Sequence, residues 1–227
     1  PVAQATFTAH FAYAFGRITT AGTITETAIP TTGAWPTHIA LGQDGNLWFT
    51  ESEGNKIARM TLEGAITEFG LPSPQSRPGG IAASPDGSLW FSESATPGRI
   101  GNITSSGTIT EIAGSGFSDI VSGPDGNFWY TDYANGKIGR LTPSGTITEY
   151  PLASATSYPC IIVAGPDGAL WFTESGSNLI GRITTAGTIT EYTIPTTDSM
   201  PEGIAFDNDG NLWFTEAYGN KIGRMTF

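Results

Sequence analysis

The sequence predicts an all-β fold, a β-propeller, in which four-stranded blades are arranged around a central axis. Three observations predict it. A motif centred on tryptophan recurs at intervals of 42, 39, 42 and 42 residues. Each repeat holds four short runs of strand-forming residues, and four strands per about 40 to 45 residues is typical of a propeller blade. Thirty Gly and fifteen Pro beside three Met favour strands and tight turns over helices.

The repeat is carried by an Asp-Gly turn followed by an apolar aromatic triplet. The five triplets are Leu47-Trp48-Phe49, Leu89-Trp90-Phe91, Phe128-Trp129-Tyr130, Leu170-Trp171-Phe172 and Leu212-Trp213-Phe214. Successive strand residues point to opposite faces, so a triplet that is apolar throughout indicates a strand buried on both faces. We therefore expect the tryptophans to pack between blades rather than to form sugar-stacking platforms.

Within one repeat, four strands are expected in order. In the fourth copy they are Ile161–Ala164, Leu170–Glu174, Leu179–Thr184 and Thr188–Tyr192. Turn residues separate them: Gly-Pro-Asp-Gly, then Ser-Gly-Ser-Asn, then Thr-Ala-Gly, and finally a longer Pro/Thr-rich stretch. The chain is thus expected to form a single domain, residues 1–227.

The ends of the chain are expected to share blades. Residues Gln4–Thr19 align without a gap on Asn211–Thr226, which places a degenerate second strand at Phe7 and Thr8. Strands are expected to follow at Phe15–Thr19 and Thr23–Thr27. The count favours six blades, one of them short and N-terminal, with five blades as the alternative. Pairing of the N- and C-terminal strands would close the ring and seal its edges.

The composition limits the classes of partner that we expect the protein to bind. Ten basic and 21 acidic residues give a net charge of −11, a field that repels nucleic-acid phosphates. No apolar run approaches the roughly 18 residues of a membrane span, so neither nucleic acid nor membrane is expected. We expect a monomer or weak dimer with a small-molecule ligand. A sequon at Asn102-Ile103-Thr104 and a Ser/Thr-rich composition favour a secreted protein whose signal has been removed.

The repeat unit resembles the streptogramin (virginiamycin B) lyase family. The resemblance lies in Gly165–Glu174, which spells GPDGALWFTE, and in Ile180–Thr184, which spells IGRIT, with close copies along the chain from Phe15 onward. It implies a seven-bladed propeller and a magnesium-dependent elimination that opens a cyclic depsipeptide ester. It also implies that histidine and glutamate at the mouth of the channel carry the reaction.

One candidate layer of site residues lies at the end of the second strand of every blade. Its members are Glu51, Glu93, Asp132, Glu174 and Glu216. A ring of carboxylates can hold a hard cation such as Mg²⁺ through oxygen ligands. Alternatively, each carboxylate caps the backbone N–H groups of its own loop. If several point inward without a metal, mutual repulsion should raise their pKa values.

A second layer lies at the start of the innermost strand. Glycine is the commonest residue there, so His38, Asp119, Glu202 and Cys160 are departures. His38 is the candidate general base or metal ligand. The candidate metal ligands or acid partners are Glu51, Asp119 and Glu202. His10 is a second catalytic candidate because it aligns with Ala217, directly after a carboxylate position. Cys160 is not expected to be a nucleophile, because no histidine neighbours it in the repeat.

A third layer precedes this entrance and differs from blade to blade. It consists of Trp35, Arg77, Phe117, Tyr158 and Met200. Large apolar side chains around a polar floor indicate a small-molecule pocket, although packing between loops would place the same residues there.

The three layers together favour a single central site over a repeated one. We expect a lyase-like enzyme that acts by elimination or cyclisation on a hydrophobic, secondary-metabolite-type molecule at the channel mouth. The alternative is a non-catalytic lectin-like or protein-binding propeller, whose site residues should repeat around the ring. The mouth residues instead differ between blades.

Overall fold

The computed structural model describes residues 14–114 and 116–226, and this part of the chain is all β. It contains four complete four-stranded sheets, one three-stranded sheet and one two-stranded sheet. The first complete blade holds β3 (Pro36–Leu41), β4 (Leu47–Glu51), β5 (Lys56–Met60) and β6 (Ile66–Gly70), and the second holds β7 (Pro78–Ala83), β8 (Leu89–Glu93), β9 (Arg99–Ile103) and β10 (Ile109–Ala113). The third holds β11 (Phe117–Ser122), β12 (Phe128–Asp132), β13 (Lys137–Leu141) and β14 (Ile147–Pro151), and the fourth holds β15 (Pro159–Ala164), β16 (Ala169–Glu174), β17 (Leu179–Thr184) and β18 (Ile189–Thr193).

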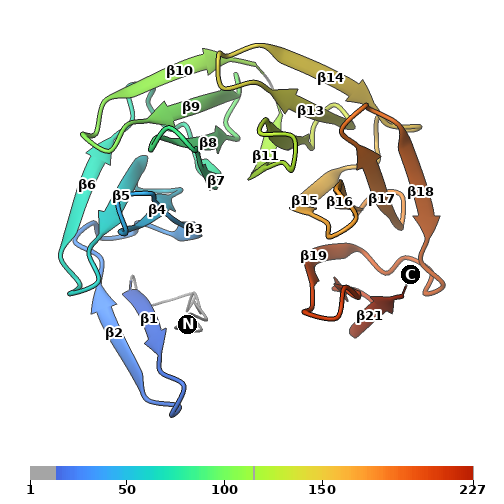
Figure 1. Ribbon diagram of the computed structural model, residues 1–227, viewed down its shortest axis with the longest axis horizontal. Coiled ribbons are helices and arrows are strands. Elements are labelled where there is room, and N and C mark those ends of the chain that lie inside the picture. Colours follow the sequence, from blue (N-terminus) through green and yellow to red (C-terminus); the bar gives the residue numbers. More distant parts are fainter. Residues whose placement is uncertain (1–13, 115, 227) are drawn as a thin grey trace.

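The sheets form an arc around a central opening, which confirms the β-propeller (Figure 1). Within each blade, consecutive strands pair antiparallel from the axis outward, so β3, β7, β11 and β15 line the opening. The partial sheets are β1 (Ala14–Ile18) with β2 (Ile24–Ala28), and β19 (Pro201–Phe206) with β20 (Leu212–Glu216) and β21 (Lys221–Met225). No helix in residues 14–114 and 116–226 is long and apolar enough to cross a membrane.

The two partial sheets stand at the two ends of the arc and are separate in the described residues. The strand expected at Phe7 and Thr8 lies outside the described residues, as does His10. Closure of the ring by pairing of the chain ends therefore stays a prediction.

The Asp-Gly turn fixes each second strand. Asp44 accepts hydrogen bonds from the backbone N–H of Asn46, at 3.1 Å, and from Nε1 of Trp48, at 3.2 Å. Asp125 and Asp167 bind the indoles of their own blades in the same way. Gly45 has φ 76°, a conformation that glycine adopts without steric cost. One short motif thus makes the turn and orients the tryptophan.

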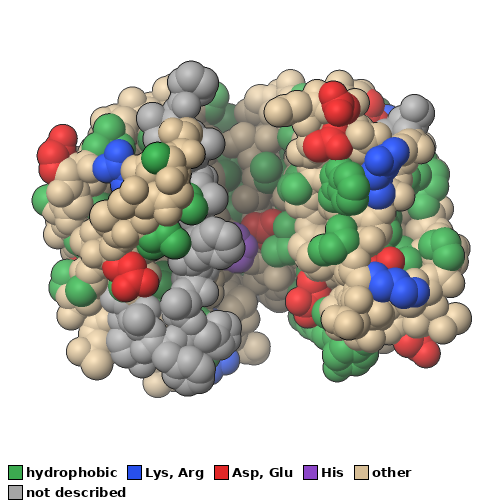
Figure 2. All heavy atoms as spheres, turned by 90° about the horizontal axis from the view of Figure 1, so that it is seen from below, with side chains coloured by type: hydrophobic (Ala, Val, Ile, Leu, Met, Phe, Trp, Pro, Cys, Tyr) green, Lys and Arg blue, Asp and Glu red, His purple; other side chains and the backbone are tan. Residues whose placement is uncertain are grey.

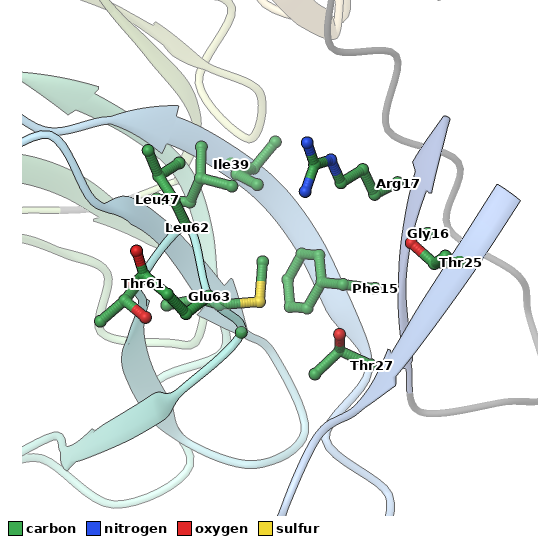
Figure 3. Close-up of a pocket in the computed structure, with 12 residues that line it drawn as sticks. Phe15, Gly16, Arg17, Thr25, Thr27, Ile39, Leu47, Thr61, Leu62 and Glu63 are labelled. Carbon is green, nitrogen blue, oxygen red and sulfur yellow. The ribbon is translucent and has the colours of Figure 1, made fainter. Parts of the chain in front are cut away.

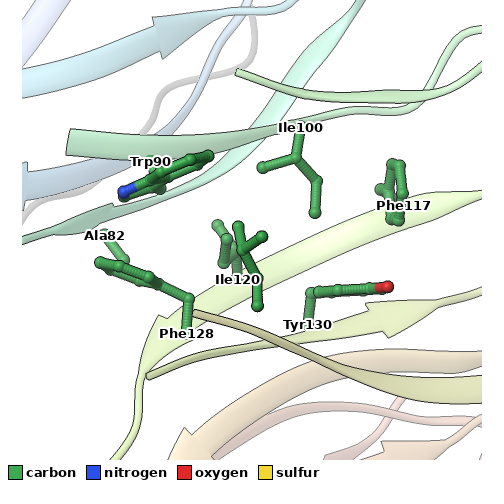
Figure 4. Packing of buried hydrophobic residues seen from close by; sticks show 8 residues of the cluster. Ala82, Trp90, Ile100, Phe117, Ile120, Phe128 and Tyr130 are labelled. Carbon is green, nitrogen blue, oxygen red and sulfur yellow. The ribbon is translucent and has the colours of Figure 1, made fainter. Parts of the chain in front are cut away.

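The tryptophans pack between blades, as the sequence predicts. Trp48, Trp129 and Trp171 are fully buried, and Trp90 is nearly so. Trp90 packs against Phe128 of the next blade, with ring centroids 5.7 Å apart, in a cluster that also contains Phe117, Ile120 and Tyr130 (Figure 4). Trp213, on the last described blade, is 37% exposed. The core is therefore a series of interfaces between adjacent blades, and each tryptophan is buried by the blade that follows it.

Candidate functional site

A belt of hydroxyl groups positions the strands that line the channel. Each inner strand has a register shift just after its first residue, so two residues form a bulge outside the regular pairing. The hydroxyl beside each bulge comes from the residue before the second-strand carboxylate: Thr50, Ser92, Thr131, Thr173 and Thr215. Thr50 Oγ1 accepts from His38 N, at 3.1 Å, and donates to Gly79 O of the next blade, at 2.8 Å.

The same bond to the following blade is made by three more members of the belt. Ser92, Thr131 and Thr173 donate to the next inner strand over distances of 2.7 to 2.8 Å. These hydroxyls were not among the predicted site residues, although Ser or Thr precedes the carboxylate in all five copies of the repeat. The belt fixes the backbone at the positions where the candidate catalytic residues stand.

His38 and Asp119 come together at the inner wall of the channel. His38 lies on β3 and Asp119 on β11, two blades along. His38 Nε2 is 3.8 Å from Asp119 Oδ1, with the imidazole 36% exposed and the carboxylate 8% exposed. Figure 2 looks through the open side of the arc and shows a hollow between its two walls, with histidine and acidic side-chain atoms inside it. The distance exceeds that of a direct hydrogen bond, so Nε2 remains available to a ligand atom.

Two glycines make this pairing possible. Gly79 and Gly80 occupy the bulge of β7, the strand between β3 and β11. A Cβ on Gly80 would clash with Asp119 Oδ1 and would lie 2.6 Å from the backbone N of Ile120. A Cβ on Gly79 would lie 2.8 Å from Ser118 O. The absence of side chains on the middle strand leaves room for the two residues to face each other.

Asp119 is held firmly on its buried side. Its Oδ1 accepts from Ile120 N at 2.9 Å, and its Oδ2 accepts from Ile162 N of the next blade at 3.1 Å. Burial raises the pKa of Asp119, while the facing His38 and the two N–H donors oppose that rise only in part. The buried carboxylate therefore faces the imidazole at a distance, 3.8 Å, at which the charge of each group acts on the other.

The second-strand carboxylates do not behave as the expected metal ring. All five are buried, and Glu51, Asp132 and Glu216 lie beneath their own loops. Asp132 accepts hydrogen bonds from the backbone N and Nδ2 of Asn135 in that loop. A Cβ on Gly54 would lie 2.8 Å from Glu51 Oε2, so Glu51 is covered by its loop as well. In residues 14–114 and 116–226, no three His, Cys, Asp or Glu side chains are grouped to hold a metal ion.

The described residues thus do not fit a shared magnesium site, and Mg²⁺ stays an expectation from the family resemblance. Burial instead dominates the chemistry of these carboxylates. It raises the pKa of Glu51, Glu93 and Glu174 to about 7. Neither oxygen of these three glutamates makes a hydrogen bond of good geometry, although hydroxyl groups nearby lower the pKa in part. Repulsion from the outer-strand Glu68 adds to the rise in the pKa of Glu51.

Four of the five predicted rim residues share one backbone conformation. Trp35, Arg77, Tyr158 and Met200 each precede a proline and have φ of 51°, 52°, 49° and 50°. This left-handed conformation costs about 1 to 2 kcal/mol for a residue with a side chain. Phe117, in contrast, is buried against Tyr130 and is not a rim residue. It occupies the proline position, because Gly116, with φ 69°, takes the left-handed place in that blade.

The structure adds two tyrosines to the rim that the sequence analysis did not single out. Tyr133 and Tyr218 follow the second strands of their blades and, with Tyr158 and Met200, line a cavity of about 430 Å³. Arg77 lines a separate cavity of about 820 Å³ on a neighbouring part of the molecule. A third cavity, of about 270 Å³, lies between β1–β2 and the β3–β6 blade (Figure 3). None of the predicted site residues lines it.

The remaining candidates differ in placement. Glu202 is exposed on β19, and its backbone O accepts from Thr173. The Sγ of Cys160 lies 3.3 Å from Ser175 Oγ and 3.4 Å from Tyr158 O. Burial raises the pKa of the Cys160 thiol, and the negative charges of Glu202 and Asp119 add to the rise. A thiol with a raised pKa is a poor nucleophile at neutral pH.

The described residues form a β-propeller with a histidine and an aspartate facing each other at the inner wall of its channel. The sequence profile of the virginiamycin B lyase family matches residues 3–116 and 112–227, so the chain belongs to the virginiamycin B lyase family. No curated protein matched the chain in a separate comparison.

Solved structures agree. A streptogramin B lyase structure is 40% identical with a TM-score of 0.93, over 98% of this chain and 76% of that chain. Virginiamycin B lyase from Staphylococcus aureus is 44% identical with a TM-score of 0.92, over 98% and 77%. A catalytically inactive histidine-to-alanine variant of virginiamycin B lyase from Staphylococcus aureus, with quinupristin, is also 44% identical, with a TM-score of 0.91 over 96% and 75%.

Proposed function

We propose that the chain is a lyase that opens a cyclic ester in a hydrophobic, secondary-metabolite-type molecule, with His38 and Asp119 as its acid–base pair. The observation that carries the proposal is the half-exposed imidazole that faces a buried carboxylate at 3.8 Å. Membership of the family supports the class of reaction, because the similar solved structures are streptogramin B and virginiamycin B lyases.

The pair suits a β-elimination. A base removes the proton from the carbon beside a carbonyl group, and the ester oxygen on the adjacent carbon leaves as a carboxylate. One C–H and one C–O bond break, a C=C bond forms, and no water is added. His38 Nε2 is placed to take the proton, because it makes no direct hydrogen bond. Asp119 stabilises the resulting imidazolium, and the pair can return the proton to solvent or to the leaving carboxylate.

The rim would hold the substrate over this pair. The exposed side chains of Trp35 and Tyr158 offer apolar surface that a hydrophobic cyclic molecule can cover. Their backbone is fixed, since Trp35 O accepts from Ser52 N at 3.0 Å and Tyr158 O accepts from Ser175 N at 3.2 Å. The described carboxylates do not converge on one site that could hold a magnesium ion.

The test is turnover of a streptogramin B cyclic depsipeptide, followed by liquid chromatography and mass spectrometry. Elimination gives a ring-opened product of unchanged mass, whereas hydrolysis gives a product heavier by one water. We expect the unchanged mass, and we expect His38→Ala to lower the rate by about 10²- to 10⁴-fold. Cys160→Ser is the matched control at the channel mouth and should keep most of the rate.

Two results would contradict the proposal. If the folded His38→Ala variant turned over at the wild-type rate, His38 would not be the base. If the wild-type protein bound the depsipeptide without converting it, the non-catalytic binding propeller would be favoured.

A further inference from the structure

The cavity bounded by Tyr133, Tyr158 and Tyr218, here called the tyrosine cleft, has a chemistry unlike the rest of the rim. Three blades build it: Tyr133 follows β12, Tyr158 precedes β15, and Tyr218 follows β20. Tyr133 and Tyr158 are stacked, with ring centroids 4.9 Å apart and planes 21° apart. Tyr218 is 78% exposed. Three aromatic rings therefore border one open space of about 430 Å³.

The rings are held in place before any ligand arrives. Tyr158 has φ 49°, and its carbonyl accepts from Ser175 N at 3.2 Å and from Ser175 Oγ at 3.0 Å. A left-handed tyrosine persists only where its surroundings fix it. Stacking on Tyr158 then limits the motion of the Tyr133 ring. Such preorganisation lowers the entropy that a ligand loses on binding.

The electrostatics of the cleft favour a positive charge. Asp198 is one of its lining residues, and no Lys or Arg is among the described residues that line it. Burial raises the pKa of the Tyr133 hydroxyl, and the charge of nearby Glu202 adds to the rise. Aromatic faces carry negative potential and attract cations, and the net charge of −11 acts in the same sense.

A neighbouring cavity offers an internal contrast. The cavity of about 820 Å³ beside Arg77 is lined by Arg77 and Arg99, and none of its described lining residues is aromatic. Arg77 there pairs with Glu53 at 3.7 Å. The difference in charge between the two cavities means that they select different chemical groups.

We propose that the tyrosine cleft binds an organic cation, a methylated or otherwise alkylated ammonium group, between its aromatic faces and Asp198. The inference goes beyond the elimination proposed above, since it concerns binding of a charged group, although Tyr158 belongs to both proposals. A ligand that carries such a group at one end would be oriented by it.

The probe is choline, compared with its uncharged isostere dimethylbutanol, in which carbon replaces nitrogen. Both are titrated into the full chain and followed by proton NMR of the aromatic resonances. We expect choline to bind saturably and about 5- to 30-fold more tightly than the isostere, as cation–π contacts of partly desolvated groups imply. Equal affinity for the two compounds, or no saturable binding of choline, would overturn the proposal.

Variants locate the site. Tyr218→Ala and Asp198→Asn should each weaken choline binding several-fold, and because both residues lie at the surface of the cleft the variants should remain folded, which thermal unfolding checks. Trp35→Ala, an exposed aromatic at the equivalent rim position of another blade, is the control and should bind choline as the wild type does. Unchanged affinity in both cleft variants would overturn the proposal. His38→Ala should still bind choline. A failure of the cation-binding proposal can therefore be told apart from a failure of the proposed elimination activity.

Discussion

Gly80 controls how His38 and Asp119 meet. A Cβ at this position would clash with Asp119 Oδ1 and with the backbone of β11, so the two strands must move apart or the carboxylate must rotate. We predict that Gly80→Ala lowers turnover at least about tenfold and destabilises the fold by about 1 to 3 kcal/mol, as overpacking does. Kinetics and denaturant unfolding measure the two effects.

Gly70→Ala is the matched control. Gly70 ends β6, and nothing lies within 4 Å of a Cβ built there. The Gly70→Ala variant should have the turnover rate and the free energy of unfolding of the wild type, within experimental error. A Gly80→Ala variant with wild-type turnover would show that the space between His38 and Asp119 is not needed.

At the residue scale, the sequence identified the candidate site residues well, but it did not predict which of them contact each other. His38 and Asp119 stand out as departures from glycine in the repeat, and the structure brings them together. That they face each other across an intervening strand depends on blade curvature, which no local pattern encodes. Phe117 was placed on the rim wrongly, because Gly116 holds the left-handed position in that blade and Phe117 stands one residue later, at the proline position.

At the scale of the strand, the hydroxyl belt joins each blade to the next. Thr173 is fully buried, accepts from Ile161 N at 3.3 Å and donates to Glu202 O at 2.8 Å. Thr173→Val keeps the shape and leaves both backbone groups without this partner. We predict a loss of about 1 to 3 kcal/mol in the free energy of unfolding, measured by chemical denaturation.

Thr190→Val is the comparison for this substitution. Thr190 is exposed on the outer strand β18, so the change should stay within about 0.5 kcal/mol. An equal effect at the two positions would mean that the Thr173 hydroxyl contributes nothing specific to the joint between blades.

Strand positions were largely predictable. In the fourth repeat, Leu179–Thr184 was predicted to the residue, and the other strands are offset by one or two positions. Asp-Gly turns and apolar triplets are local signals, so they mark the strands well. The bulges were not foreseen, because they depend on hydroxyl bonds made between blades.

At the scale of the whole molecule, three buried glutamates in the first, second and fourth complete blades share one property. The pKa of Glu51, Glu93 and Glu174 is raised to about 7, above the ordinary value in an unfolded chain. The folded state therefore binds more protons than the unfolded state between about pH 4.5 and pH 7, so stability falls as pH rises through this window. We predict a melting temperature that is higher at pH 5 than at pH 8.

Glu93→Gln removes one of these titrations while keeping the shape of the side chain. It should reduce the difference in melting temperature between pH 5 and pH 8. Glu63→Gln, at an exposed turn, should leave that difference as it is in the wild type. A melting temperature that rises from pH 5 to pH 8 would contradict the assignment of these carboxyl groups.

The pairing of His38 with Asp119 across a glycine-bearing blade also bears on how such a protein can evolve. Repeat proteins gain and lose units by duplication and deletion, and each blade here packs mainly on its neighbours, so the scaffold can tolerate such events. The His38–Asp119 pair cannot tolerate them, because its geometry needs three different blades in a fixed order. Deletion of the middle blade, or its replacement by a copy of another, would leave a propeller in which the two residues no longer meet. The site therefore constrains the order of units in a fold whose packing alone would allow them to be exchanged.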